Sequence, residues 1–425
     1  MNQKVEDGKT VLVDGPASVT VLLGKVEVFG SVLRKTRKVV IREGKMLPFA
    51  VKEKAIFDVS LGENAKVKEV DGDTIPLSWI RAYEDLSSLQ VRPAIALVLG
   101  AVDSGKTGFC TYLINKLLNE KQRVVILDGD LGQSDVGPPC TIAYAFVTKP
   151  VTDLFNLEAR NAFFVGVTSP SKAIDNVIEG LASLKKEVLS DNPSFIVINT
   201  DGWVLGEEAI NYKVQLVEQL SPDIVFCIQQ KDELVPILNA LEKFRSVIID
   251  LPSTIRQRNR EKRRSLRELG YMKYLKNAKV RSIPLNWLRI EADDWIGSSI
   301  IQRDFRQARK IYELLGMKPT HFAELRDKFC IIIGGRRWIN PEAIKKVEEF
   351  TKKKVVVIRE GEEQGLLTAL YDSEMQFLGI GVLREINYKR RTVQIYTAIS
   401  KDISIIATGR VKLDKNLREI PFLEE

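Results

Sequence analysis

Eight residues, Gly100 to Thr107, carry the most specific chemical signal in the chain. They read Gly-Ala-Val-Asp-Ser-Gly-Lys-Thr, which fits the pattern G-x-x-x-x-G-K-[ST]. Between a strand and a helix, this pattern binds phosphates with backbone N–H groups and the helix N-terminus. An apolar run over residues 94–99 precedes it, and apolar residues at helical spacing follow it. We predict a nucleoside-triphosphate site formed by Gly100, Asp103, Ser104, Gly105, Lys106, Thr107 and Gly108.

Two carboxylates, Asp128 and Asp130, follow the next apolar run of the chain. An acidic residue at the C-terminal tip of a strand beside a P-loop holds Mg²⁺ or positions a nucleophile. Side chains at i and i+2 point the same way from a strand, so we expect both to face the γ-phosphate. The alternative is that they only end a strand and begin a turn. The predicted Mg²⁺ ligands are Thr107, Asp128 and Asp130.

Polar and aromatic residues follow two further apolar runs. Trp203 ends the segment Asn-Thr-Asp-Gly-Trp; at the ligand-bearing edge of a sheet it would stack a nucleobase, whereas elsewhere it would be a core residue. Thr168 and Ser169 begin a predicted helix, where they bind a phosphate or simply cap the helix.

A basic segment accounts for the net charge of the chain. Residues 256–279 hold ten Lys or Arg and two Glu, a net charge of +8 that equals the charge of the whole protein. A helix here would align Arg260, Arg263, Arg264 and Arg267 on one face, where like charges repel. A solvated charged face is the ordinary interpretation of such a run. Because two Glu cannot neutralise it, we predict instead an arginine lid near residues 254–276 that binds phosphate.

The pattern of apolar residues divides the 425-residue chain into three predicted domains. Short alternating segments indicate a β-rich domain over residues 1–88. Strands alternating with helices indicate an α/β domain with a mostly parallel sheet over residues 89–315, and a β-rich domain follows over 316–425. The four cysteines form no C-x-x-C pair and no apolar stretch is long enough to span a bilayer, so we expect a cytoplasmic protein without membrane association.

Together these motifs resemble the polynucleotide 5′-hydroxyl-kinase family of RNA-processing factors. The resemblance covers nearly the whole chain, and the compact C-terminal part looks like that of archaeal members. It implies an N-terminal β domain that helps to bind adenine, a central kinase domain and a β-rich C-terminal domain. It further implies that Asp130 accepts the proton of the attacking hydroxyl. The implied catalytic residues are Lys106, Asp130, Arg263 and Arg267, and the implied substrate-binding residues are Gln133, Thr168, Ser169, Trp203 and Arg258.

We therefore expect a kinase that uses ATP and Mg²⁺ to phosphorylate the 5′-hydroxyl end of RNA, with DNA as a second candidate acceptor and RNA-processing proteins as candidate partners. Two alternatives remain: an ATP-bound scaffold without turnover, and a kinase of nucleosides or nucleotides, which the extended basic segment disfavours. A GTPase is also disfavoured, because Gln229-Gln-Lys-Asp232 lacks the Asn of a guanine-binding motif.

Overall fold

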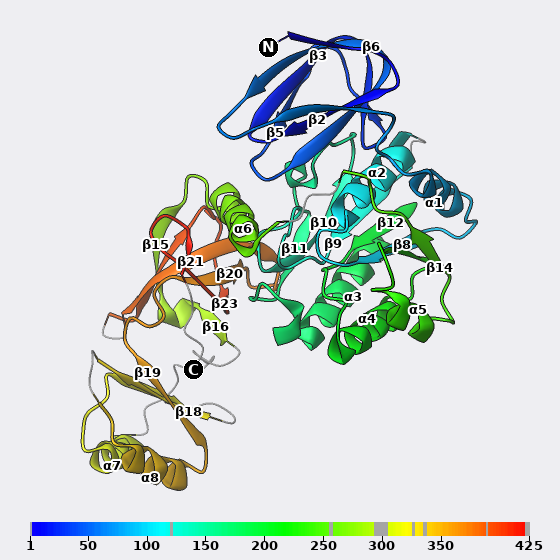
Figure 1. Ribbon diagram of the computed structural model, residues 1–425. Coiled ribbons are helices and arrows are strands. Elements are labelled where there is room, and N and C mark those ends of the chain that lie inside the picture. Colours follow the sequence, from blue (N-terminus) through cyan, green and yellow to red (C-terminus); the bar gives the residue numbers. More distant parts are fainter. Residues whose placement is uncertain are drawn as a thin grey trace. The chain divides into compact units, whose positions relative to one another are not determined.

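The computed structural model describes residues 2–119, 122–254, 258–292, 305–324, 328–334, 338–387 and 390–420. It divides into two compact units, Met1–Gly270 and Tyr271–Glu425. Each unit is described by itself below (Figure 1).

The first unit begins with a seven-stranded antiparallel sheet. Its long strands β3 and β6 pair along their length, and alternate residues such as Val19, Val21, Phe57 and Val59 are buried, which is the pattern of a sheet with one face in a core. The strands are β1 (Asn2–Val5), β2 (Lys9–Asp14), β3 (Ala17–Val28), β4 (Ser31–Val32), β5 (Lys38–Ile41), β6 (Met46–Leu61) and β7 (Val67–Asp71).

A second seven-stranded sheet forms the centre of this unit, in the order β11-β10-β9-β12-β8-β13-β14. The strands from β9 to β14 in this order are parallel. Nearly all their residues are buried, as expected where helices cover both faces. The bounds are β8 (Ala94–Gly100), β9 (Val124–Asp128), β10 (Thr141–Val147), β11 (Asn161–Phe164), β12 (Phe195–Asn199), β13 (Ile224–Ile228) and β14 (Ser246–Ile249).

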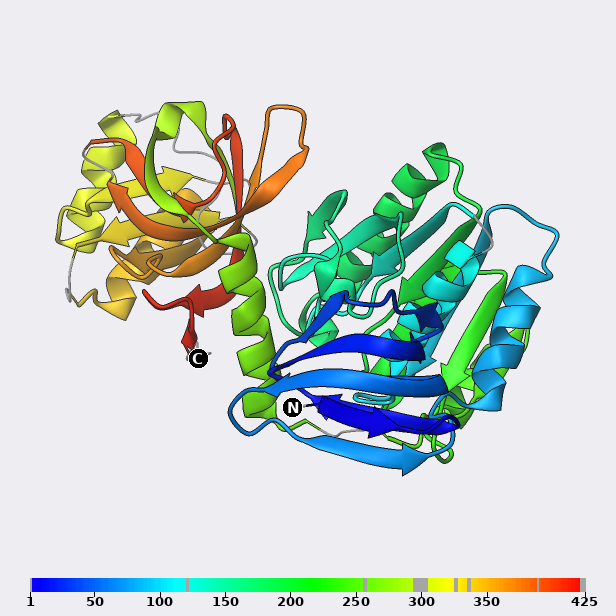
Figure 2. The same cartoon turned by 90° about the horizontal axis from the view of Figure 1, so that it is seen from above.

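Helices pack on both faces of the central sheet (Figures 1 and 2). Helices α1 and α2 contact each other and one face, while α3, α4 and α5 contribute to the core on the other. The predicted α/β class with a mostly parallel sheet is confirmed. Strand β10 was not predicted, although its apolar run resembles those of the strands that were; it runs antiparallel to β9 and β11. The helices are α1 (Leu77–Ser87), α2 (Lys106–Asn119), α3 (Ile174–Ser190), α4 (Glu207–Leu220), α5 (Val235–Ala240) and α6 (Arg260–Tyr274).

The second unit contains a seven-stranded sheet and a three-stranded sheet with two helices. Strands β15 and β16 pair with β22 and β23 of the larger sheet, so strand pairing places residues 279–292 with the C-terminal part, ahead of the boundary predicted at residue 315. The elements are β15 (Lys279–Pro284), β16 (Arg289–Ala292), α7 (Phe305–Leu315), β17 (His321–Glu324), β18 (Lys328–Ile333), α8 (Pro341–Thr351), β19 (Lys354–Arg359), β20 (Leu366–Tyr371), β21 (Phe377–Asn387), β22 (Thr392–Thr397), β23 (Ile405–Leu413) and β24 (Glu419–Ile420).

Among the described helices, none has the length and hydropathy needed to cross a membrane.

Helix α1 is anchored by Trp79, which is fully buried. Its ring lies against Phe109 and Tyr112 of α2, with centroids 5.2 and 5.8 Å away. Its indole N–H donates to the carbonyl oxygen of Asp250 at 2.9 Å. This one side chain therefore joins α1, α2 and the segment after β14.

We expect Trp79→Ala to lower the free energy of unfolding of this unit by about 3–5 kcal/mol, because it leaves a large cavity and an unpaired carbonyl. Urea unfolding followed by circular dichroism measures the change. Leu77→Ala, in the same helix but 71% exposed, is the control and should change stability by less than about 0.5 kcal/mol. Equal losses in the two variants would contradict the anchoring role.

Candidate active site

A cavity of about 750 Å³ lies at the carboxyl ends of the central strands, within the first unit. Its walls come from the P-loop, the segments that follow β9, β11 and β12, the N-terminal sheet and α6. The structure brings most of the predicted site residues together here. Those that line the cavity are Asp103, Ser104, Gly105, Lys106, Thr107, Gly108, Asp130, Gln133, Thr168, Ser169, Trp203, Arg258, Arg263 and Arg267.

The P-loop holds Lys106 in a buried position at the start of α2. Its ammonium group donates to the carbonyl oxygens of Gly100 and Ala101 at 2.9 and 2.8 Å. Burial lowers the pKa of Lys106, while the nearby carboxylate of Asp130 acts in the opposite direction. Gly100 is not among the residues that line the cavity; an added Cβ there would lie 2.5 Å from Oγ of Ser104, so glycine allows the loop to fold back closely on residue 100.

Asp128, a predicted Mg²⁺ ligand, is not among the residues that line the cavity. The side chain is fully buried. Its carboxylate accepts hydrogen bonds from the side-chain amide of Asn199 at 2.9 Å and from the backbone N–H groups of Asp135 and Val136 at 2.8 and 3.2 Å. Asp128 thus ties the segment after β9 to β12. Burial raises the pKa of Asp128 to about 7.

Asp130 lines the cavity, as predicted. Its Oδ1 accepts the backbone N–H groups of Gly132 and Gln133, both at 3.0 Å. Burial raises the pKa of Asp130, and the ammonium group of Lys106 opposes this shift. A carboxylate with a raised pKa is a stronger proton acceptor than one in water.

The segment that carries Asp130 is also held by the N-terminal sheet. Asp135 forms ion pairs with Arg42 and with Lys45, the latter at 2.6 Å, and these cations keep the pKa of Asp135 well below its usual range. Arg42 also pairs with Asp153 at 2.6 Å and lies over the ring of Phe155. The sequence did not predict these ion pairs, because a turn between two strands of a β domain carries no local pattern that indicates a contact with a residue 90 positions away.

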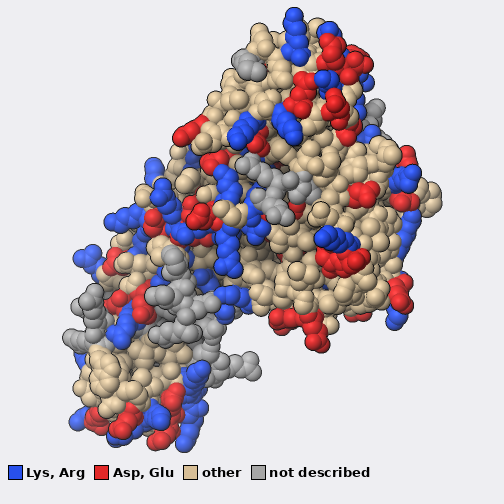
Figure 3. Space-filling model, in the orientation of Figure 1, with Lys and Arg blue, Asp and Glu red and all other residues tan. Residues whose placement is uncertain are grey.

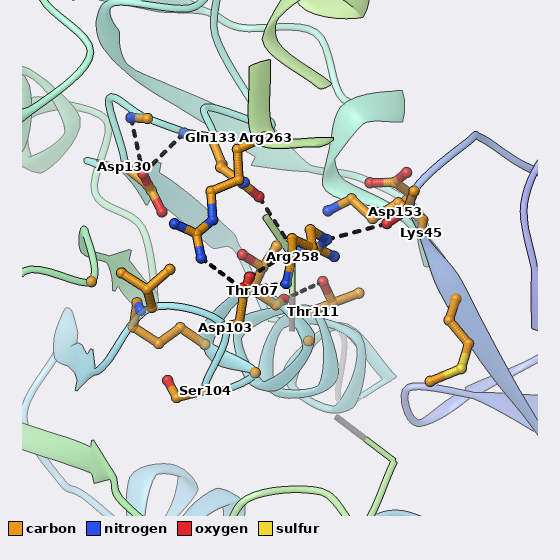
Figure 4. A pocket seen from close by; sticks show the side chains of 18 of the residues that line it. Lys45, Asp103, Ser104, Thr107, Thr111, Asp130, Gln133, Asp153, Arg258 and Arg263 are labelled. Carbon is orange, nitrogen blue, oxygen red and sulfur yellow. Dashed lines mark hydrogen bonds and ion pairs between the residues drawn. The ribbon is translucent and has the colours of Figure 1, made fainter. Parts of the chain in front are cut away.

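Two lid arginines converge on the P-loop (Figure 4). The carboxylate of Asp103 accepts the backbone N–H of Arg258 at 2.9 Å and the guanidinium groups of Arg258 and Arg263 at 3.2 and 2.9 Å. Arg258 also donates to Oε1 of Gln133 at 3.2 Å, and Arg267 donates to the carbonyl of Gly132 at 3.5 Å. Asp103, an acidic partner that the sequence did not reveal, therefore neutralises part of the basic segment. The Lys and Arg side chains of this segment gather over α6 in Figure 3.

Three buried polar atoms around the cavity have no hydrogen-bond partner among the described residues. They are Oγ of Ser104, Nε2 of Gln133 and Nε of Arg263. Unsatisfied buried donors are unfavourable in a native protein unless a ligand completes them. They come from the P-loop, the Asp130 segment and α6, so a bound group with several acceptor oxygens, such as a polyphosphate, fits the space between these elements.

The opposite wall of the cavity is apolar and comes largely from the N-terminal sheet and α1. It includes Phe29, Met46, Leu47, Pro48, Ile75 and Trp79. The sequence predicted no individual residue of this wall, although the resemblance implied that the N-terminal domain helps to bind adenine. Such a surface suits a planar base, while the P-loop and the lid suit its phosphates.

The fold and the cavity are those of a P-loop nucleotide-binding protein. Polar side chains of the segments after β9 and β11 line the cavity together with the P-loop. Residues 100–277 match the family model described as mRNA cleavage and polyadenylation factor CLP1 P-loop. The chain is 30% identical to a polyribonucleotide 5′-hydroxyl-kinase of Methanocaldococcus jannaschii over 354 residues, which covers 80% of this chain and 94% of the relative. It is 27% identical to the protein of that name in Pyrococcus abyssi, covering 85% and 99%.

A solved structure titled as the wild-type Clp1p–Pcf11p complex has the same fold, with a TM-score of 0.69, 13% identity and 97% of both chains covered. The chain therefore belongs to the polyribonucleotide 5′-hydroxyl-kinase family, as its motifs predicted.

We expect Asp128→Asn to change the pH dependence of stability. Because the folded-state pKa of Asp128 is raised to about 7, folding favours the protonated carboxyl group, and the stability of the wild-type protein declines as pH rises from about 4 to 7. The Asn variant lacks this decline, so its melting temperature relative to wild type should rise between pH 5 and pH 8. Thermal unfolding at both values measures the shift.

Asp71→Asn is the control, since it makes the same substitution at a surface side chain that is 95% accessible. The Mg²⁺ concentration for half-maximal activity should be the same in Asp128→Asn as in wild type. A large rise in this Mg²⁺ concentration would instead indicate that Asp128 is a metal ligand.

Proposed function

We propose that this protein transfers the γ-phosphate of ATP to the 5′-hydroxyl end of RNA. The observation that carries the proposal is the convergence on one cavity of a P-loop lysine, a buried carboxylate and lid arginines, in a chain that belongs to this kinase family. Phosphoryl transfer needs little more than positioning and charge stabilisation, and this set of residues supplies both.

The P-loop side holds the donor. Backbone N–H groups from Ser104 to Gly108 and the N-terminus of α2 bind the β- and γ-phosphates, and Lys106 exchanges the two carbonyls for phosphate oxygens. The hydroxyl of Thr107 would hold Mg²⁺, since hydroxyl oxygens are among the ligands it favours. The metal would neutralise part of the phosphate charge.

The opposite side holds the acceptor. Oδ1 of Asp130 is occupied by two backbone N–H groups, so we assign Oδ2 to the 5′-hydroxyl, whose proton it accepts as the oxygen attacks the γ-phosphorus. Arg263 and Arg267 stabilise charge on the transferring group, and Arg258 with Gln133 steadies the lid. Thr168 and Ser169 bind the first backbone phosphate of the RNA, and Trp203 stacks its terminal base.

A polynucleotide acceptor is favoured over a nucleoside because Trp203 and the lid arginines line the same cavity, and because the relatives are named polyribonucleotide 5′-hydroxyl-kinases. DNA stays a second candidate acceptor. The cytoplasmic location and the association with RNA-processing proteins also stay predictions.

We expect Lys106→Ala and Arg263→Ala each to lower kcat by a factor of about 10² or more, because each removes a positive charge from the transferring phosphoryl group. The assay follows the γ-label of ATP into matched 5′-hydroxyl RNA, DNA and nucleoside. Lys116→Ala, on α2, and Lys262→Ala, on α6, are matched controls outside the cavity and should retain wild-type rates.

Wild-type protein that binds ATP but labels none of the acceptors would favour the scaffold. Labelling of the nucleoside alone would favour a small-molecule kinase.

A further inference from the structure

A lysine is completely buried on α4, beside the cavity rather than in it. Lys213 has an exposed fraction of 0% and lies among core residues of the helix. Burial lowers the pKa of Lys213. An ammonium group in such a place is strongly unfavourable unless it is paired and hydrogen-bonded. The group that pairs with Lys213 therefore indicates the role of this buried charge.

That partner is Asp201, which follows β12 and lines the cavity. Lys213 Nζ donates to Oδ2 of Asp201 at 2.7 Å and to its backbone carbonyl at 3.2 Å. The hydroxyl of Tyr212 donates to the same Oδ2 at 2.7 Å. The other oxygen, Oδ1, accepts the backbone N–H of Trp203 at 2.9 Å. Asp201 thus links two neighbouring residues of α4 to the backbone of Trp203.

The ring of Tyr212 supports the ring of Trp203 directly. The two rings are stacked, with centroids 5.8 Å apart and planes at 25°. Tyr212 is 1% exposed, so it has one fixed position in the core. Trp203 is half-buried and lines the cavity. Tyr212 therefore covers one face of the indole and leaves the rest of Trp203 for the cavity.

Gly202 fixes this segment against the P-loop. A Cβ on Gly202 would lie 2.6 Å from the backbone N and Cα of Val102, so only glycine allows the two backbones to approach so closely. The segment from Asp201 to Trp203 is held between the P-loop on one side and α4 on the other. The position of Trp203 is thereby set relative to the phosphate site.

We propose that Tyr212, Lys213 and Asp201 are positioning residues that hold Trp203 as a fixed platform for the terminal base of the polynucleotide acceptor. The inference rests on the proposed function. It gives the buried charge pair a role in substrate binding, because α4 fixes the position of Trp203. The close approach of Gly202 to Val102 then sets the distance of Trp203 from the P-loop, which aligns the 5′-hydroxyl with the γ-phosphate.

The test uses the full-length protein and a 5′-hydroxyl oligoribonucleotide whose first base is 2-aminopurine, a base that loses fluorescence when it stacks. Tyr212→Leu removes the supporting ring. We expect the KM for the oligonucleotide to rise about tenfold and the fluorescence quenching to be mostly lost, with the KM for ATP within twofold of wild type. The control is Tyr144→Leu, which removes another buried tyrosine of the same core, outside the cavity.

A double-mutant cycle with Trp203→Ala separates positioning from general stability. If Tyr212 acts through Trp203, the double variant should be no worse than Trp203→Ala alone. Additive effects, or a KM for the oligonucleotide that Tyr212→Leu leaves unchanged, would overturn the proposal. Failure of the proposed function looks different, because wild type itself would then neither quench nor phosphorylate the oligonucleotide.

The charge pair is tested with Asp201→Asn combined with Lys213→Met. This double variant removes both charges and keeps the side-chain volumes, so no buried charge is left unpaired, and it remains informative if Tyr212→Leu fails to fold. We expect at least a threefold rise in the KM for the oligonucleotide and weaker quenching in a folded protein. Wild-type quenching and KM would overturn the role of Asp201 and Lys213.

Discussion

The constraint on which the site depends is the pairing of charges removed from water. Lys106 donates to loop carbonyls, Arg258 and Arg263 share Asp103, and Lys213 pairs with Asp201. In a low-dielectric cavity, each of these charges would be costly alone. The protein therefore supplies internal partners for these charged groups, and a bound phosphate would replace some of them and complete the atoms of Ser104, Gln133 and Arg263 that lack a partner among the described residues.

The same principle explains how the segment after β9 keeps its shape without regular secondary structure. Asp128 satisfies its N–H groups from within the sheet, while Arg42 and Lys45 of the N-terminal sheet hold Asp135 from outside. Asp130 lies between these two anchored residues in the chain, and its Oδ1 accepts the backbone N–H groups of the turn that follows it. The position of Asp130 thus depends on contacts that reach both sheets.

The features that the sequence predicted well are those encoded locally. The P-loop, the arginine helix and the parallel strands depend on spacing over fewer than 20 residues. Asp128 does not line the cavity beside Asp130, because side chains at i and i+2 share a direction only while the strand continues, and β9 ends at Asp128. Tyr212, Lys213 and Arg42 could not be found, since helical spacing gives no sign that a lysine is buried, and an ion pair between two sheets leaves no mark in either segment.

Asp103 affects which anions can bind to Arg258 and Arg263 in the cavity. Its carboxylate is part of the loop itself, so it competes with every incoming anion at the high effective concentration of an intramolecular group. A singly charged anion gains little by replacing it at Arg258 and Arg263. A chain of phosphates can draw on the loop N–H groups and Lys106 at the same time, and so outcompetes it. The pairing of Asp103 with these two arginines therefore favours a polyphosphate over a small anion.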